Sequence, residues 1–167
     1  MDYRITVTTI YHCTLEQAFK TPILSDVTKV HTGLLVMPRV THCANDSGWG
    51  QPGSAKQVFV APSLTQKGGF ASVDKVVERI ENQYWKIQVA DFQAWMLGFY
   101  QFTGEWATRE IAPGEIEIIY TYTLHANSNL LMPLQWLFAK LFWPRYMRQV
   151  LENIRKMIQN KEPYLFP

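Results

Sequence analysis

Residues 99–126 read FYQFTGEWATREIAPGEIEIIYTYTLHA, and this stretch decides the fold. Apolar and polar side chains alternate on both sides of a turn at Ala112, Pro113 and Gly114, which predicts a long antiparallel hairpin of residues 99–111 and 115–126. We expect the apolar phase to face the concave side of a sheet. That phase contains Tyr100, Phe102, Gly104, Trp106, Ile116, Ile118, Tyr120, Tyr122 and Leu124.

A helix is predicted to follow the hairpin, over residues 128–160. Apolar side chains recur there at intervals of three and four, which indicates one buried stripe. Pro144 lies inside the segment and is expected to kink the helix or to divide it in two. The predicted stripe consists of Leu134, Leu137, Leu141, Met147, Leu151, Ile154 and Ile158.

The N-terminal part predicts one strand and two short helices. Residues 3–11 alternate with a period of two, as a strand does. Thr14 is a predicted N-cap with Gln17 in the capping-box position, and Pro22 is expected to end that helix. A second short helix is predicted from Ser25 to Gly33. Further strands are predicted at residues 39–44, 55–61, 70–81 and 84–91.

This order of elements predicts an α+β fold with a single antiparallel sheet. One long helix cannot cover both sides of such a sheet, so we expect a strongly curved sheet of about seven strands wrapped around the C-terminal helix. The two short helices follow the first strand. This arrangement predicts one domain over residues 1–167, with a cavity between the sheet and the helix.

The composition supports a globular ligand-binding protein. Of the 167 residues, 47% are hydrophobic and 18% are charged, and 16 basic residues against 14 acidic ones leave a net charge of +2. These values exclude disorder and a nucleic-acid partner bound by electrostatic attraction. The aromatic content of 14% is high. It indicates a large core, a large apolar pocket, or both.

The ends and the cysteines predict a cytoplasmic protein. The first residues alternate and lack the apolar region of a signal peptide. The most apolar stretch, residues 130–143, is too short for a span of about 20 residues, so no stable membrane insertion is expected. Cys13 and Cys43 fit a reducing compartment. Each follows a histidine at a strand edge, where neighbouring side chains point to opposite faces, so neither a metal nor a cofactor is expected.

Three segments carry a resemblance to a known family. Residues 49–58, WGQPGSAKQV, resemble the W-G-x-P-G-S turn and following strand of many polyketide cyclase-like proteins. Residues 72–80, SVDKVVERI, resemble the next strand of that group, and residues 133–158 resemble its closing helix. The chain thus resembles the SRPBCC superfamily, which includes START-like lipid carriers and the birch-pollen-allergen type. The resemblance implies a helix-grip fold but does not select one function, because the superfamily contains ligand carriers, cyclases, receptors and interaction modules.

The leading hypothesis is a hydrophobic small-molecule ligand held between the sheet and the C-terminal helix. Tyrosines on the apolar phase favour a pocket over a solid core, because a buried hydroxyl group needs a partner. Trp49 lies in a glycine-rich loop, where it either borders the pocket mouth or anchors the turn on the sheet. The predicted ligand-binding residues are Tyr100, Phe102, Trp106, Tyr120, Tyr122, Leu137, Leu141 and Trp49.

Two other interpretations stay open. In the first, the protein is a cyclase or dehydratase in which a pocket tyrosine or carboxylate moves protons. The orientation of Asp74 and Glu78 is undecided, because both phases of residues 70–81 mix apolar and charged side chains. His31 and His42 either move protons near neutral pH or are ordinary exposed histidines. In the second, residues 131–143 form a protein or membrane contact.

The second interpretation depends on the number of apolar residues in this part of the helix. More of them occur in residues 131–143 than one buried stripe requires. The excess predicts a homodimer contact, a lid over the cavity or a lipid-facing patch.

Overall fold

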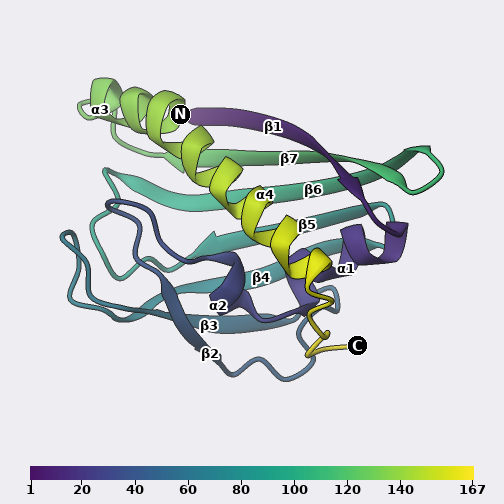
Figure 1. Cartoon of the computed structure of the whole chain (residues 1–167). Coiled ribbons are helices and arrows are strands. Elements are labelled where there is room, and N and C mark those ends of the chain that lie inside the picture. Colours follow the sequence, from purple (N-terminus) through teal and green to yellow (C-terminus); the bar gives the residue numbers. More distant parts are fainter.

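The computed structural model describes residues 1–167 and shows a seven-stranded antiparallel sheet that arches around the C-terminal helix (Figure 1). The strands lie in the order β1-β7-β6-β5-β4-β3-β2. The predicted helix-grip fold is confirmed. The elements are β1 (Asp2–His12), α1 (Leu15–Leu24), α2 (Val27–Val30), β2 (Val40–Ala44), β3 (Ala55–Val60), β4 (Gly69–Ile80), β5 (Tyr84–Ala90), β6 (Phe99–Ala112), β7 (Glu115–Ala126), α3 (Met132–Leu137), η1 (Phe138–Phe142) and α4 (Trp143–Gln159).

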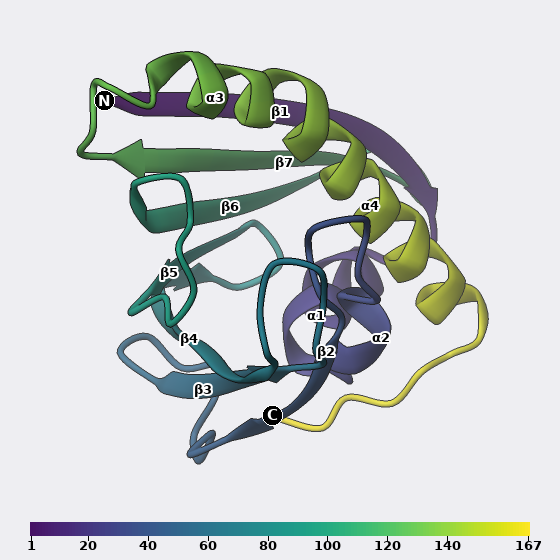
Figure 2. The same ribbon diagram turned by 90° about the vertical axis from the view of Figure 1, so that its left-hand side faces the viewer.

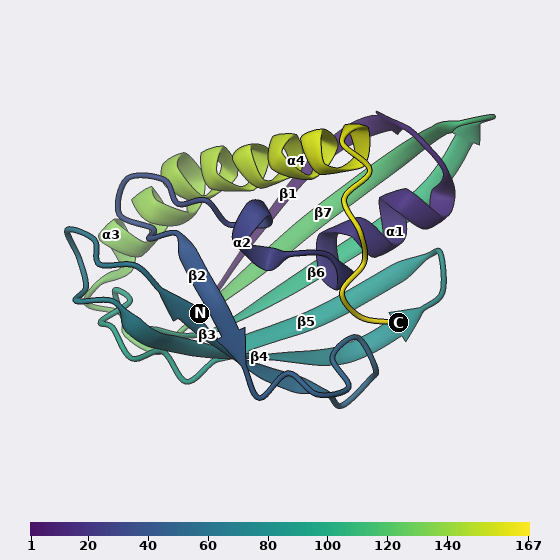
Figure 3. The same ribbon diagram turned by 60° about the horizontal axis from the view of Figure 1, so that its bottom comes forward.

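The curvature of the sheet encloses the short helices. Figure 2 shows the arch nearly end on, with α1 and α2 inside it, and Figure 3 shows α4 crossing its open side. The main core fills the space between the sheet and the helices and contains 27 buried residues. The helices therefore cover only the concave face of the sheet.

A β-bulge in β6 corrects one prediction about the hairpin. Phe99 pairs with Ala126 and Gln101 pairs with His125, so Tyr100 is an extra residue without a partner in the ladder. An extra residue reverses the alternation of side chains. Phe99 is therefore buried, whereas Tyr100 is 53% exposed and lies beside His125. The expectation that Tyr100 faces the concave side is wrong.

A second bulge explains the mixed phases of β4. Val76 pairs with Ile87 and Glu78 pairs with Lys86, which leaves Val77 unpaired. Before this bulge Asp74 lies on the same face as the buried Val76. After it the phase reverses, so Glu78 is exposed.

The first helix forms as predicted at its start but not at its end. Thr14 and Gln17 make the capping box. Pro22 lies inside α1, which continues to Leu24, although a proline was expected to end it. Proline has no N–H to donate to the carbonyl of Ala18. The indole Nε1 of Trp106 donates to that oxygen at 3.1 Å instead, so the sheet supplies the missing hydrogen bond.

The C-terminal helical segment runs from Met132 to Gln159 without a break, so Pro144 does not divide it, and its buried stripe differs from the predicted one. The π-helical turn η1 precedes Pro144 and adds a residue to one turn, which rotates the preceding side chains around the axis. Leu134, Leu137 and Leu141 are consequently about half exposed. The buried stripe is Gln135, Ala139, Trp143, Tyr146, Met147, Val150, Leu151, Ile154 and Met157.

No helix in the structure combines the length and the apolar character needed to cross a membrane.

Candidate functional site: a cavity between the sheet and the helices

Two adjoining hollows lie between the concave face of the sheet and the helices. The helix-side hollow, bordered by Val27, Trp49 and Trp106, has a volume of about 60 Å³. The loop-side hollow, bordered by Met37 and Trp95, has a volume of about 130 Å³. Both hollows share one wall, which consists of His31, Asp74, Val89 and Tyr122. The two hollows therefore adjoin along this shared wall.

Most of the predicted pocket residues border these hollows. Trp49, Trp106 and Tyr120 line the helix-side hollow, Phe102 lines the loop-side hollow, and Tyr122 borders both. Phe102, Trp106, Tyr120 and Tyr122 lie on the concave side, as the alternation of the strands predicted. Their contact with a ligand stays a prediction.

Three predicted residues lie outside the cavity. Tyr100 is turned outward by the bulge in β6. Leu137 and Leu141 border an apolar groove on the outside of the helix, together with Leu34 and Leu35. The π-helical turn places them there, so they do not line the cavity. A dimer contact, a lid or a lipid-facing patch in this groove stays a prediction.

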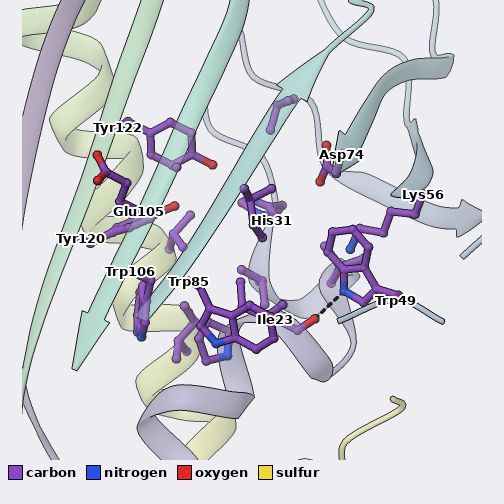
Figure 4. A pocket seen from close by; sticks show the side chains of 18 residues that line it. Ile23, His31, Trp49, Lys56, Asp74, Trp85, Glu105, Trp106, Tyr120 and Tyr122 are labelled. Carbon is purple, nitrogen blue, oxygen red and sulfur yellow. Dashed lines mark hydrogen bonds between the residues drawn. The ribbon is translucent and has the colours of Figure 1, made fainter. Parts of the chain in front are cut away.

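Trp49 anchors the glycine-rich loop and also borders the cavity. Its side chain is 1% exposed, and its Nε1 donates a hydrogen bond of 2.9 Å to the carbonyl oxygen of Ile23 (Figure 4). The loop approaches α1 closely, because a Cβ atom on Gly50 would lie 2.6 Å from a methyl group of Leu24. Gly50 also has a positive φ of 97°, which favours glycine. The anchoring role considered for Trp49 is thus present, and the same side chain lines the helix-side hollow.

Lys56 is the charged side chain that the sequence interpretation missed. It lies in phase with Val58 and Val60 on β3, and it is 5% exposed. Its ammonium Nζ lies 3.9 Å from the centre of the Trp49 ring. A cation–π contact of this kind contributes about 0.5–2 kcal/mol. Burial of an ammonium group without an ion pair costs several kcal/mol, so this contact does not offset the burial.

Asp74 points into the cavity from the neighbouring strand. It is the cross-strand partner of Lys56 and borders both hollows. Its side chain retains some accessible surface because it borders the hollows, although protein surrounds it. Burial raises the pKa of the Asp74 carboxyl group to about 6, and the charge of Lys56 opposes that rise. The open question about this strand is thus answered, since Asp74 faces inward and Glu78 faces outward.

Polar rings complete the shared wall between the hollows. Burial is the main cause that raises the pKa of Tyr122 to about 12, and the nearby Asp74 adds to it. Burial also lowers the pKa of His31 to about 4. The Nδ1 atom of His31 lies 2.8 Å from the hydroxyl oxygen of Tyr146 on α4. His42, in contrast, is exposed and stacks on Phe59.

Some polar groups of the cavity could be placed from the sequence, and others could not. The alternation of residues 55–60 was sufficient to place Lys56 beside Val58 and Val60. No comparable pattern marked His31, which caps the short helix α2, or Tyr146 on α4. Val89 on β5 borders both hollows.

Comparisons with known proteins establish the fold. No family model matches the sequence, and no match is found among curated proteins. The crystal structure of Ara h 8.0201 is similar with a TM-score of 0.72 and 13% identity, over 96% of this chain and 99% of that chain. A protein of unknown function from Staphylococcus aureus has a TM-score of 0.71 and 11% identity, over 96% of each chain.

A third similar structure comes from an enzyme. It is a point mutant of norcoclaurine synthase from Thalictrum flavum in complex with a transition-state analogue, with a TM-score of 0.67 and 11% identity, over 96% of each chain. At these identities the likenesses show the fold alone. They confirm the helix-grip fold that the resemblance to the SRPBCC superfamily implied.

Proposed function

We propose that this helix-grip protein binds a hydrophobic small molecule in the cavity between the sheet and the C-terminal helix. The observation that carries the proposal is the pair of adjoining hollows with mainly apolar walls. Hydrophobic residues make up 12 of the 18 that line the helix-side hollow and 15 of the 21 that line the loop-side hollow. Binding gains about 25 cal/mol for each Å² of apolar surface removed from water. The hydroxyl group of Tyr122 provides a polar contact that orients the ligand.

The volume of the hollows limits the size of the ligand. An apolar protein cavity of about 150 Å³ binds a molecule as large as benzene. The two adjoining hollows have volumes of about 60 and 130 Å³, so a ligand body of one or two rings would have to occupy both. The complex of norcoclaurine synthase with a transition-state analogue supports ligand binding by a protein of this fold.

Calorimetric titration with 2-naphthamide, a neutral two-ring probe, tests the proposal. The test variant is Val89→Phe, because Val89 borders both hollows and a phenyl group would fill the space between them. The control is Ile119→Phe, which adds a similar group at a partly exposed position of β7. We expect the wild type and the control to bind the probe and Val89→Phe to bind it at least about tenfold more weakly.

Two results would contradict the proposal. One is a folded wild type that does not bind the probe. The other is equal affinity in the wild type and in Val89→Phe. Val150→Phe, which fills the helix-side hollow from α4, is a second test variant in case Val89→Phe does not fold.

A second candidate function is proton transfer to or from a bound substrate, as in a cyclase or dehydratase. Asp74 favours it, because this inward carboxyl group has a pKa raised to about 6 and can change its protonation near neutral pH. Glu105 also borders the helix-side hollow, but it accepts a hydrogen bond from Tyr84 at 2.7 Å and pairs with Arg4 at 3.2 Å. Asp74 is therefore the candidate acid or base.

Exchange of the α-hydrogens of 2-tetralone in deuterated water, followed by NMR, tests this candidate. We expect the wild type to accelerate the exchange and Asp74→Asn to lose the acceleration while it still binds 2-naphthamide. Glu78→Gln, a change of an exposed carboxylate on the same strand, is the control. Equal exchange rates in wild type and Asp74→Asn would exclude Asp74 as the base.

A further inference from the structure

Lys56 is the one charged side chain among the buried residues of the protein. Lysine and arginine ion pairs occur elsewhere, for example between Lys29 and Glu162 and between Arg109 and Glu117. None of the ion pairs in the structure includes Lys56. A buried ammonium group without an anionic partner is rare in proteins, because buried charges are paired as a rule.

The nearest candidate partner within the protein does not form the pair. Asp74 lies directly opposite Lys56 on β4 and points into the same cavity. Even so, no carboxylate oxygen lies within 4.0 Å of the Lys56 ammonium, which instead covers the face of Trp49. Figure 4 shows the Lys56 side chain extending toward Trp49, while the Asp74 carboxylate points to the space beside Tyr122 and His31. The two charges border one cavity from separate places on its wall.

We infer that the ligand of this cavity carries an anionic group, of the carboxylate class, which forms an ion pair with the Nζ atom of Lys56. This inference rests on the proposed function and names the chemical class of its ligand. The apolar body of the ligand occupies the space between Trp106, Tyr122 and Val89, and its anionic group is directed to the wall formed by Lys56 and Trp49. The ligand is thus an amphipathic organic acid with a body of one or two rings.

The contacts around Lys56 are suited to a ligand anion. The Lys56 ammonium borders the helix-side hollow, so it can donate hydrogen bonds to a carboxylate there without a change in the fold. The low-polarity walls of the cavity strengthen such a pair relative to water. An amide of equal shape gains neither the charge pair nor the stronger hydrogen bond.

A matched pair of probes tests the inference. The probes are 2-naphthoate and 2-naphthamide, which share the ring system and differ in the charge of the head group. Both are titrated by calorimetry into the wild type, into Lys56→Met and Lys56→Gln, and into Lys75→Met. Lys75 is an exposed lysine on β4, so its substitution removes the same charge outside the cavity. Thermal unfolding of each variant confirms that it is folded.

We expect the wild type and Lys75→Met to bind 2-naphthoate at least about tenfold more tightly than 2-naphthamide. In Lys56→Met and Lys56→Gln this preference should fall to less than about twofold, with little change for the amide. Equal affinities for the two probes in the wild type would overturn the inference and leave the proposed function intact. A preference that persists in a folded Lys56 variant would also overturn it. Binding of neither probe would contradict the proposed function itself.

Discussion

The Nδ1 atom of His31 lies 2.8 Å from the hydroxyl oxygen of Tyr146, and the two rings stack with their centres 6.0 Å apart. The contact joins the end of α2 to the first turn of α4. His31 borders both hollows, and Tyr146 borders the loop-side hollow. Because a neutral His31 can accept a hydrogen bond from the Tyr146 hydroxyl group, the contact fixes the position of one cavity wall.

Protonation of His31 should destabilise the fold at mildly acidic pH. Burial lowers the pKa of His31 from 6.5 to about 4, so the unfolded chain takes up a proton between these values that the folded chain does not. The free energy of unfolding therefore has its full value, as far as His31 is concerned, above pH 6.5. It decreases as the pH falls toward 4. Urea unfolding at pH 7 and pH 5 should show a smaller loss of stability in His31→Asn than in the wild type. Equal losses of stability in His31→Asn and in the wild type would contradict the effect assigned to His31.

The effect of Asp74 on the stability of the fold should have the opposite dependence on pH. Burial raises its pKa from 3.8 to about 6, so the folded chain binds the proton more readily, and stability increases as the pH falls from 6 toward 3.8. Asp74→Asn should be more stable than the wild type at pH 8, and this advantage should shrink by pH 5. Urea unfolding at both values measures the effect. The titratable groups that face Asp74 are Lys56, His31, Cys43, Tyr122 and Tyr146.

A result in which Asp74→Asn is less stable than the wild type at pH 8 would show that the Asp74 carboxylate makes a stabilising contact. Glu78→Gln should show neither effect, since Glu78 is exposed.

Gly104→Ala should weaken ligand binding through Tyr122. The two residues pair across β6 and β7, and a Cβ atom on Gly104 would lie 3.0 Å from the Cζ atom of Tyr122. The ring must then move away from the sheet and into the hollows that it borders. We expect about tenfold weaker binding of 2-naphthamide and a loss of stability of about 1–3 kcal/mol, as overpacking causes. Thr103→Ala, at the adjacent position on the opposite face, is the control. Unchanged affinity in a folded Gly104→Ala protein would contradict this account.

Lys56→Met should raise the melting temperature of the ligand-free protein. Methionine has a similar length and removes a buried charge that has no ion pair. Thermal unfolding, compared with the exposed control Lys75→Met, measures the difference. A lower melting temperature in Lys56→Met would mean that the contact with Trp49 outweighs the burial of the charge.

The order of the elements could be predicted from the sequence because each has a clear periodicity. The alternation in β7 placed Tyr120 and Tyr122 on the concave side, and Thr14 and Gln17 marked the start of α1. The predictions of side-chain orientation are wrong where one inserted residue changes the face to which the neighbouring side chains point. The bulge at Tyr100 and the π-helical turn before Pro144 each insert one residue, and tertiary packing determines where that residue lies.

The candidate site was predictable in its aromatic part and less so in its polar part. Pairing across strands decides the orientation of Asp74, because the bulge at Val77 separates it from Glu78. His31 lies after a four-residue helix, and its burial depends on the contact with Tyr146. Such contacts join segments that are far apart in the sequence, and no local pattern shows them.

The most direct test of the central proposal is an NMR spectrum of methyl-labelled valine, leucine and isoleucine residues with 2-naphthamide. Intermolecular nuclear Overhauser effects would locate the probe. We predict effects at Val30, Val89 and Val150, whose side chains border the hollows. Effects confined to Leu34, Leu137 and Leu141 in the outer groove, or no effects at all, would contradict the account.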